Sequence, residues 1–169
     1  MEPVWKLCYK MNDLSFGKLM EVYAQSNLEN GQEFWPEESR MRQIALSEQN
    51  FYNYLQQVFF KTPGACCCVL EKGNCYLSAM RLEPYRDGLL LEALETAPDM
   101  RCRGYAKTLI RNMQKHTGSQ KIYSHVGKRN LASLRTHESC GFRRISDFAV
   151  YADGSVNRRC FTLCYDPNL

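Results

Sequence analysis

The sequence predicts an α/β chain (of the α+β kind) with a mixed, mostly antiparallel central sheet of about seven strands and about four helices. Three observations support this class. Three short strands between residues 65 and 96 predict an antiparallel meander. A strand, a helix and a second strand over residues 89–126 predict a parallel crossover. Two strands joined by a turn near the C-terminal end predict a hairpin.

The first third of the chain is expected to hold one strand and two helical stretches. The strand is expected at Trp5–Tyr9. Apolar residues within Asp13–Ser26 recur at i, i+3, i+4 and i+7, which predicts an amphipathic helix. Residues 27–35 are expected to form a polar and aromatic connection. Pro36 precedes two glutamates, which is typical of a helix start, and helical character continues to about Phe60.

The middle of the chain changes from helical to strand periodicity after a Thr-Pro-Gly break at residues 62–64. Turns containing glycine then separate three strands, which the pattern places at Ala65–Glu71, Cys75–Glu83 and Leu89–Thr96. The remaining elements are expected to be two helices, a strand between them and a final hairpin, at Ala106–His116, Lys121–Val126, Asn130–Ser139, and Phe142–Tyr151 with Asn157–Tyr165. No internal repeat or long linker divides the chain.

The composition is that of an ordinary globular chain, with 44% hydrophobic and 24% charged residues among 169. Its apolar runs are too short for a membrane span, and the first residues lack the pattern of an export signal. We therefore expect a cytoplasmic protein with no membrane partner. The nine cysteines are scattered or consecutive and form no C-x-x-C pair, so most are expected to be reduced and buried, with no metal site.

Charge is divided unevenly along the chain. Residues 1–100 hold nine basic and fourteen acidic side chains, whereas residues 101–169 hold thirteen basic and four acidic ones. This asymmetry indicates a charged partner. A nucleic-acid binder is one alternative, but the chain shows no RNA- or DNA-binding motif and few aromatic residues among the basic ones. We expect no nucleic-acid partner.

The change of charge falls on a turn, Arg101–Lys107, that lies between a predicted strand and a predicted helix. A glycine turn leading into a helix directs free main-chain N–H groups at an anion. Gly104 lets the main chain approach closely, while Arg103 and Lys107 can pair with the anion from the side. The turn therefore predicts a phosphate site.

Two motifs resemble the GNAT superfamily of acetyl-CoA-dependent N-acetyltransferases. The turn reads Arg101-x-x-Gly104-x-Ala106, similar to the family pattern Gln/Arg-x-x-Gly-x-Gly/Ala. A second pattern, whose spacing also matches, comprises Val126, Asn130, Ser133, His137, Gly141 and Phe142. This chain departs from the family at His137, where tyrosine is usual. The resemblance covers residues 65–151 well, and the N-terminal third only in its order of elements.

The resemblance implies one acetyltransferase-like domain, 1–169, with helices on both faces of the sheet. Residues 1–64 would form the acceptor side, 65–151 the acetyl-CoA-binding core and 152–169 the C-terminal hairpin strand. It implies acetyl-CoA as co-substrate and direct attack by a primary amine in a ternary complex. We expect no metal, and a monomer or a homodimer, since the final hairpin with Phe161 and Tyr165 could pair with a second copy. The alternative is a non-catalytic regulatory module that binds coenzyme A or an acyl-CoA.

The resemblance also assigns cofactor residues. The main chain at the end of the third meander strand would hold the pantetheine arm, and a main-chain N–H there would bind the oxyanion. The turn would wrap the pyrophosphate. The expected cofactor residues are Leu94, Glu95, Thr96, Arg101, Cys102, Arg103, Gly104, Tyr105, Ala106, Lys107, Asn130 and Ser133.

The chemistry needs an acid for the leaving thiolate and a base for the amine. His137 stands where the family tyrosine would act as acid; alternatively, it is only a polar residue on a helix face. Glu92, Glu95 and His125 compete for the role of base. In a strand with regular alternation, Glu92 shares a face with Leu94, and Glu95 lies on the opposite face. Burial in so apolar a strand should raise the pKa of Glu92.

The acceptor side is expected to involve the connection between the first two helices. Its candidate binding residues are Glu29, Glu33 and Trp35, because carboxylates with aromatic rings suit a cationic amine. The expected acceptor is a positively charged small molecule or peptide amine. The alternative is that this segment only caps helices and covers the surface.

Overall fold

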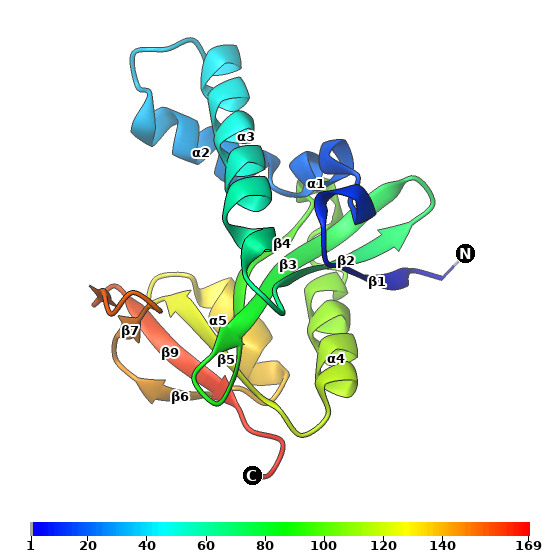
Figure 1. Ribbon diagram of the computed structural model, residues 1–169, viewed down its shortest axis with the longest axis vertical. Helices are drawn as coiled ribbons and strands as arrows, with labels where there is room; N and C mark the ends of the chain where they lie inside the picture. The colour runs from blue at the N-terminus through cyan, green and yellow to red at the C-terminus, as the bar shows by residue number, and fades with distance from the viewer. Residues whose placement is uncertain (1) are drawn as a thin grey trace.

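The computed structural model describes residues 2–169 and contains a seven-stranded sheet with helices on both faces (Figure 1). The strand order is β1-β2-β3-β4-β5-β9-β6. These strands are β1 (Val4–Cys8), β2 (Cys66–Lys72), β3 (Cys75–Tyr85), β4 (Gly88–Thr96), β5 (Lys121–Gly127), β6 (Arg143–Ser146) and β9 (Cys160–Tyr165). Two short strands, β7 (Ala149–Val150) and β8 (Val156–Asn157), pair with each other between β6 and β9. The α/β class and the mostly antiparallel sheet are confirmed.

The described chain has five α-helices rather than about four: α1 (Phe16–Val22), α2 (Ala24–Phe34), α3 (Arg40–Gln57), α4 (Tyr105–Thr117) and α5 (Leu131–Ser139). Three single 3₁₀ turns accompany them at Met11–Asp13, Phe59–Lys61 and Pro98–Met100. Across residues 2–169, we find no helix whose length and apolar character would let it cross a membrane.

Two sequence predictions about the first helices were wrong. The helix expected over Asp13–Ser26 breaks at Tyr23, and a second helix continues to Phe34, so residues 27–35 are largely helical rather than a connection. The next helix begins at Arg40 instead of Pro36. Its N-cap is Ser39, whose side chain accepts a hydrogen bond from the amide of Arg42 at 3.3 Å. The cap therefore outweighs the proline as a start signal.

Strand β4 changes partners along its length. It pairs antiparallel with β3 throughout, but it pairs parallel with β5 only from Gly88 to Leu91. Past that point β4 carries a bulge, because the register with β3 shifts and Ala93 adopts a φ of 48°. A bulge bends a strand and increases its twist. The carboxyl half of β4 therefore leaves β5, and that side of its main chain has no partner strand in the described chain.

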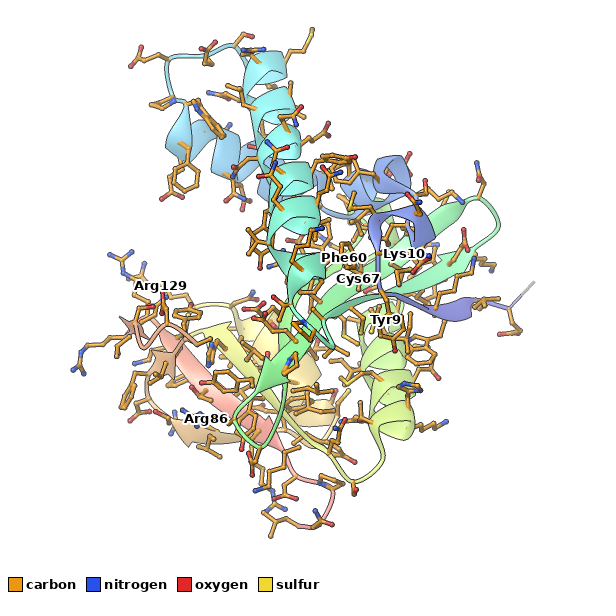
Figure 2. All side chains as sticks on the ribbon, viewed as in Figure 1. Tyr9, Lys10, Phe60, Cys67, Arg86 and Arg129 are labelled. Carbon is orange, nitrogen blue, oxygen red and sulfur yellow. The ribbon has the colours of Figure 1, made fainter. Side chains whose placement is uncertain are left out.

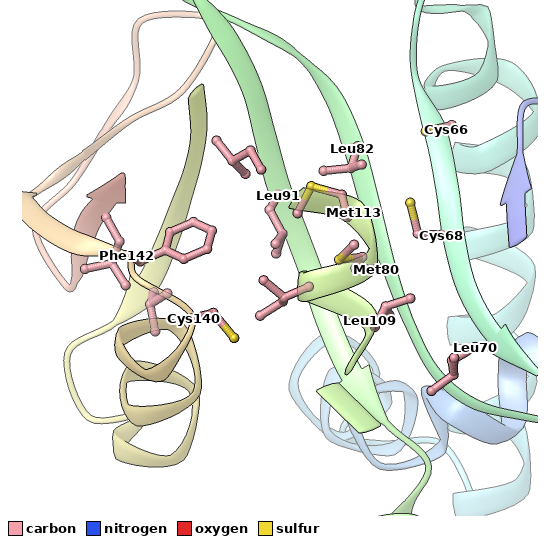
Figure 3. Packing of buried hydrophobic residues seen from close by; sticks show 14 of the residues in the cluster. Cys66, Cys68, Leu70, Met80, Leu82, Leu91, Leu109, Met113, Cys140 and Phe142 are labelled. Carbon is pink, nitrogen blue, oxygen red and sulfur yellow. The ribbon is translucent and has the colours of Figure 1, made fainter. Parts of the chain in front are cut away.

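Two clusters of buried side chains hold the helices against the sheet. On one face α1 and α3 supply Leu19, Val22 and Leu55. On the other face Leu109 and Met113 of α4 pack with strand residues and with Phe142, as Figure 3 shows. A fully buried side chain of this size contributes about 1.5–3 kcal/mol. The sheet is thus covered on both faces.

All nine cysteines are free thiols, and five of them are buried. Cys66 and Cys68 belong to the cluster beneath α4, while Cys67 between them belongs to the cluster on the opposite face, where Phe60 also packs (Figure 2). Burial raises the pKa of Cys67 to about 12. The three consecutive cysteines therefore act as small core residues of a strand that is covered on both faces.

Helices α2 and α3 lie side by side and extend together beyond the sheet (Figure 1). Gly31 makes this contact possible, since a Cβ at that position would lie 2.7 Å from the carbonyl oxygen of Gln43.

We expect Gly31→Ala to lower the free energy of unfolding by about 1–3 kcal/mol, measured by urea denaturation, because the helices must separate. Gly17→Ala, whose Cβ meets nothing within 4 Å, is the control and should be neutral or stabilising. Equal effects of the two substitutions would contradict this account.

Candidate active site

A cleft of about 850 Å³ opens where β4 and β5 separate. Its walls come from β4, the turn before α4, the first turn of α4, the end of β5, α5 and the start of α2. Eleven of the twelve cofactor residues expected from the sequence line it: Leu94, Glu95, Thr96, Arg101, Cys102, Gly104, Tyr105, Ala106, Lys107, Asn130 and Ser133. Arg103 is exposed and does not line the cleft.

The turn before α4 presents unoccupied main-chain donors. Within residues 2–169, no protein acceptor takes a hydrogen bond from the amides of residues 101–107. Cys102 and Gly104 have φ values of 60° and 82°, which bend the chain around the start of the helix. A Cβ built on Gly104 meets nothing within 4 Å. Free amides at a helix N-terminus next to open space suit a phosphate group.

Two basic side chains accompany this turn in different ways. Arg101 donates from Nη1 to Oε1 of Gln25 at 2.5 Å and from Nε to the carbonyl oxygen of Thr96 at 3.3 Å. It therefore ties α2 to the end of β4. Lys107, in the first full turn of α4, lines the cleft and has no ion-pair partner in the described chain. Its charge is free to meet an anion.

The bulge in β4 corrects the expected direction of two glutamates. Leu94 packs against the cluster beneath α4, whereas the Glu95 carboxylate accepts a hydrogen bond from Ser26 of α2 at 2.5 Å. Glu92 lies opposite Arg81 of β3, whose guanidinium packs on rings from α3. Glu92 and Glu95 thus face the same layer of helices, because the extra residue reverses the alternation. The prediction that they face opposite ways was wrong.

Burial raises the pKa of both glutamates above the ordinary value of 4.5. Ser26 and then Arg101 oppose this rise at Glu95, and Arg81 opposes it at Glu92. The two glutamates also differ in position. Glu95 lines the cleft, but Glu92 lines neither the cleft nor the smaller cavity beside it.

His137 lines the cleft but is only 1% exposed. Its Nδ1 lies 2.8 Å from the carbonyl oxygen of Ser133, and its Nε2 lies 3.0 Å from Oγ of Ser124. A carbonyl can only accept, so Nδ1 carries the proton and Nε2 accepts from Ser124. Burial lowers the pKa of His137 below 6.5. The ring is therefore neutral and has both nitrogens engaged by the protein.

His125 also lines the cleft, at the end of β5, and its environment differs. Tyr85 donates its hydroxyl proton to the carbonyl oxygen of Val150, so only its oxygen lone pair faces Nε2 of His125, at 3.5 Å. Nδ1 is buried and has no partner in the described chain. Burial, and next the charge of Arg86 at the β3–β4 turn (Figure 2), lower the pKa of His125. A neutral ring with an unpaired nitrogen can take a proton.

A second cavity of about 390 Å³ adjoins the cleft between α2, α3 and the strands β3 and β4. The two cavities share Ser26, Ala93 and Glu95. Of the expected acceptor residues, Trp35 lines the second cavity and Glu29 lines the cleft, whereas Glu33 lines neither of these two cavities. The expectation that all three share one site is not met, because α2 turns Glu29 and Glu33 toward different surroundings.

Sequence reasoning missed Arg81 and Ser26. Arg81 is a lone cation inside an otherwise apolar stretch of β3, and that isolation was an available signal. No sequence signal marked Ser26, because its role depends on how α2 lies over the β4 bulge. In the described part of the chain, no group of three or more metal-binding side chains is present.

The sequence matches the family model of the acetyltransferase (GNAT) family over residues 25–142. The chain therefore belongs to this family and is an acyltransferase of the GNAT type. The matched segment contains the turn before α4, the strands β4 and β5, and both His125 and His137. A comparison with curated protein sequences gives no match.

Several solved structures have a similar fold. One is a PaiA N-acetyltransferase from Thermoplasma acidophilum in complex with coenzyme A, with a TM-score of 0.63, 14% identity and coverage of 96% of this chain and 99% of that one. Another, described as histone acetyltransferase HPA2 and related acetyltransferase from Corynebacterium glutamicum, has a TM-score of 0.69, 14% identity and coverage of 100% and 98%. A third is a spermidine N-acetyltransferase from Vibrio cholerae in complex with CoA and spermine, with a TM-score of 0.61, 18% identity and coverage of 97% and 96%. At these identities the likeness shows the fold.

The buried state of His137 makes stability depend on pH. Its folded pKa lies below 6.5, so below that pH the unfolded chain binds a proton that the folded chain does not. The free energy of unfolding should fall as pH drops below 6.5, by at most about 1.4 kcal/mol per pH unit for each such histidine. Urea denaturation between neutral and mildly acidic pH measures the slope. His137→Asn should reduce it, and an unchanged slope would contradict the assignment.

Proposed function

We propose that this protein transfers an acetyl group from acetyl-CoA to a primary amine by direct attack in a ternary complex. The donor occupies the cleft between β4 and β5, and the acceptor occupies the adjoining cavity beneath α2 and α3. The observation that carries this proposal is the position of Glu95, whose carboxylate borders both cavities. A base at such a junction can reach an amine that approaches the donor.

The cleft fits the donor. Acetyl-CoA supplies an acetyl group activated as a thioester. The amides of residues 102–107 and the Lys107 ammonium are suited to its pyrophosphate, because they are donors without protein acceptors. The main chain of β4 beyond Leu91 lacks a partner strand on one side, so it can hydrogen-bond the pantetheine arm as an added strand would. We assign the amide of Leu94 or Glu95 to the acetyl oxygen.

The acceptor side supplies the proton acceptor. As the amine nitrogen bonds to the acetyl carbon and the carbon–sulfur bond breaks, Glu95 accepts the proton that the amine loses. Ser26 holds the carboxylate in place, and burial brings its pKa closer to the working range of a base. The structural neighbour that binds spermine is an amine acetyltransferase, which supports an amine acceptor here.

The two histidines take different roles in this proposal. His137 has no spare proton for the leaving thiolate, because its Nδ1 proton is donated to Ser133, so we assign it a positioning role between α5 and β5. His125 is the alternative base, since its Nδ1 is buried and unpaired in the described chain. It lines only the donor cleft, which favours Glu95.

A regulatory module that binds coenzyme A without transfer is the second candidate. The specific observation in its favour is His137, which replaces the usual tyrosine and is fully engaged within the protein. Thiol release from acetyl-CoA with a panel of amines separates the two. Binding of coenzyme A without thiol release for any amine would favour the module.

Glu95→Gln tests the base. We expect kcat/KM to fall by about 10²–10⁴ and the acidic limb of its pH profile to disappear, because the rate rises as Glu95 loses its proton at a pKa above 4.5. Glu29→Gln is the control, since Glu29 lines the cleft but is exposed, and its profile should keep the limb. If Glu95→Gln keeps the limb and His125→Asn loses it, His125 is the base instead.

Gly104→Val tests the donor site. The new side chain extends into the open space beside the turn and also disfavours the φ of 82°. We expect the affinity for coenzyme A, measured by calorimetric titration, to fall by about tenfold or more. Gly73→Val is the matched control, because Gly73 has a φ of 60° and equally open surroundings in the β2–β3 turn. A similar loss in both variants would show that backbone strain, not the lost site, is responsible.

A further inference from the structure

The acceptor cavity proposed above has an unusual balance of side chains, and the inference below rests on that proposed function. Among its lining residues, five are aromatic and two are charged, while the others are small or uncharged polar residues. The aromatic ones are Tyr23, Phe34, Trp35, Phe51 and Tyr54. The charged ones are Glu95, at the junction with the donor cleft, and Arg81 of β3.

Arg81 is held by aromatic rings rather than by carboxylates. Its guanidinium carbon lies 5.5, 5.0 and 5.6 Å from the ring centroids of Phe51, Tyr54 and Phe59. None of the ion pairs among residues 2–169 includes Arg81, and its Nε is buried without a hydrogen-bond acceptor. The side chain as a whole is partly buried, but a buried donor atom such as this Nε usually has a hydrogen-bond acceptor. Arg81 is therefore a cation positioned beside a cavity with its hydrogen-bond donors unused.

Other charged groups pack near Arg81 but leave it unpaired. Glu92 is its cross-strand neighbour on β4, and Glu83 lies two residues further along β3. Neither glutamate lines the cavity, and neither lies within ion-pair distance of Arg81 in the described chain. The lining itself thus carries one negative and one positive group, so its charge is balanced.

The two charged groups are separated along the strands. Glu95 pairs in register with Ala79, and Arg81 lies two residues beyond Ala79, about 7 Å along β3. Ser47 of α3 adds a second unpaired donor to the same cavity, because it is 5% exposed and its Oγ has no partner among residues 2–169. The cavity therefore presents a carboxylate where it meets the donor cleft, Arg81 further along β3, and a second unused donor on Ser47.

We propose that the acceptor is an amino-carboxylate, with its amine at Glu95, its carboxylate on Arg81 and an apolar or aromatic body against the aromatic wall. The planar fork of an arginine matches a carboxylate with two parallel hydrogen bonds. Ser47 can donate a further hydrogen bond. The cavity volume of about 390 Å³ lies within the usual range for a small-molecule site.

The same geometry disfavours a polyamine. A second ammonium group at the far end of the acceptor would lie beside the Arg81 guanidinium in a partly dehydrated cavity, where like charges repel strongly. The rings of Phe51 and Tyr54 are already in contact with that guanidinium. They are less available as a cage for another cation. Arg81 is thus proposed as the residue that sets acceptor specificity.

Matched acceptors test the proposal. One set is phenylalanine, phenylalanine methyl ester and phenethylamine; the other is 5-aminopentanoate, pentylamine and 1,5-diaminopentane. Transfer is followed by thiol release, and binding is followed by calorimetric titration in the presence of coenzyme A. We expect the carboxylate member of at least one set to exceed its uncharged partner by tenfold or more in kcat/KM and in affinity, and the diamine to be the poorest. The proposal is overturned if neither carboxylate is preferred, that is, if the ester or phenethylamine matches phenylalanine and pentylamine or the diamine matches 5-aminopentanoate.

Arg81→Met should remove the preference for the carboxylate while leaving affinity for coenzyme A unchanged, and Arg81→Lys should retain part of it. Arg144→Met is the matched control, since Arg144 also packs on a ring, 4.7 Å from Phe161, but lines neither cavity. An unchanged preference in a folded Arg81→Met variant, checked by circular dichroism, overturns the proposal. If the Arg81→Met variant does not fold, the proposal is judged from the acceptor preference of the wild-type protein and of Arg81→Lys. Equal preference for the carboxylate and its uncharged partner in the wild-type protein then overturns it.

Failure of the proposed function gives a different result. A protein that binds neither coenzyme A nor acetyl-CoA lacks the donor site altogether. If coenzyme A binds but no amine is acetylated, the titrations still decide, because a carboxylate that binds no better than its uncharged partner overturns the role of Arg81.

Discussion

The parting of β4 from β5 is the constraint on which the rest of this structure depends. The two strands share only four residue pairs, ending at Leu91 and Ser124. The bulge at Ala93 then bends β4 toward α2. This one irregularity opens the cleft in which we propose that the donor binds, frees one side of the β4 main chain and brings Glu95 to the point where the two cavities meet. Without it, β4 and β5 would continue as a closed sheet.

The cleft is also where the backbone departs from preferred conformations. Among residues 2–169, three non-glycine residues have positive φ values, and two of them, Ala93 and Cys102, line the cleft. Each such conformation costs about 1–3 kcal/mol and persists only when the surrounding structure enforces it. Tyr23 holds the carbonyl of Ala93 at 2.6 Å, and the two core clusters secure the strands and α4. Stability from the core therefore offsets strain at the site.

Four buried polar atoms have no partner among residues 2–169, and three of them belong to residues that line one of the two cavities, namely Arg81, Ser47 and His125. The fourth, Nε1 of Trp5, lies away from both cavities. His137 also lines the cleft, but it has partners on both nitrogens and joins α5 to β5. An unsatisfied buried donor or acceptor is unfavourable, so the three groups at the cavities gain most from a bound molecule.

Local sequence was enough to predict the meander, the crossover, the helix that the structure places at residues 105–117 and the glycine turn before it, because each depends on short-range periodicity, glycine and capping. It was also enough to name eleven residues that line one cleft. It could not reveal that Glu92 and Glu95 share a face, that Glu33 lies outside both cavities or that Arg81 borders one. Those facts depend on a bulge and on how α2 and α3 lie over the sheet, which only long-range packing between distant segments decides.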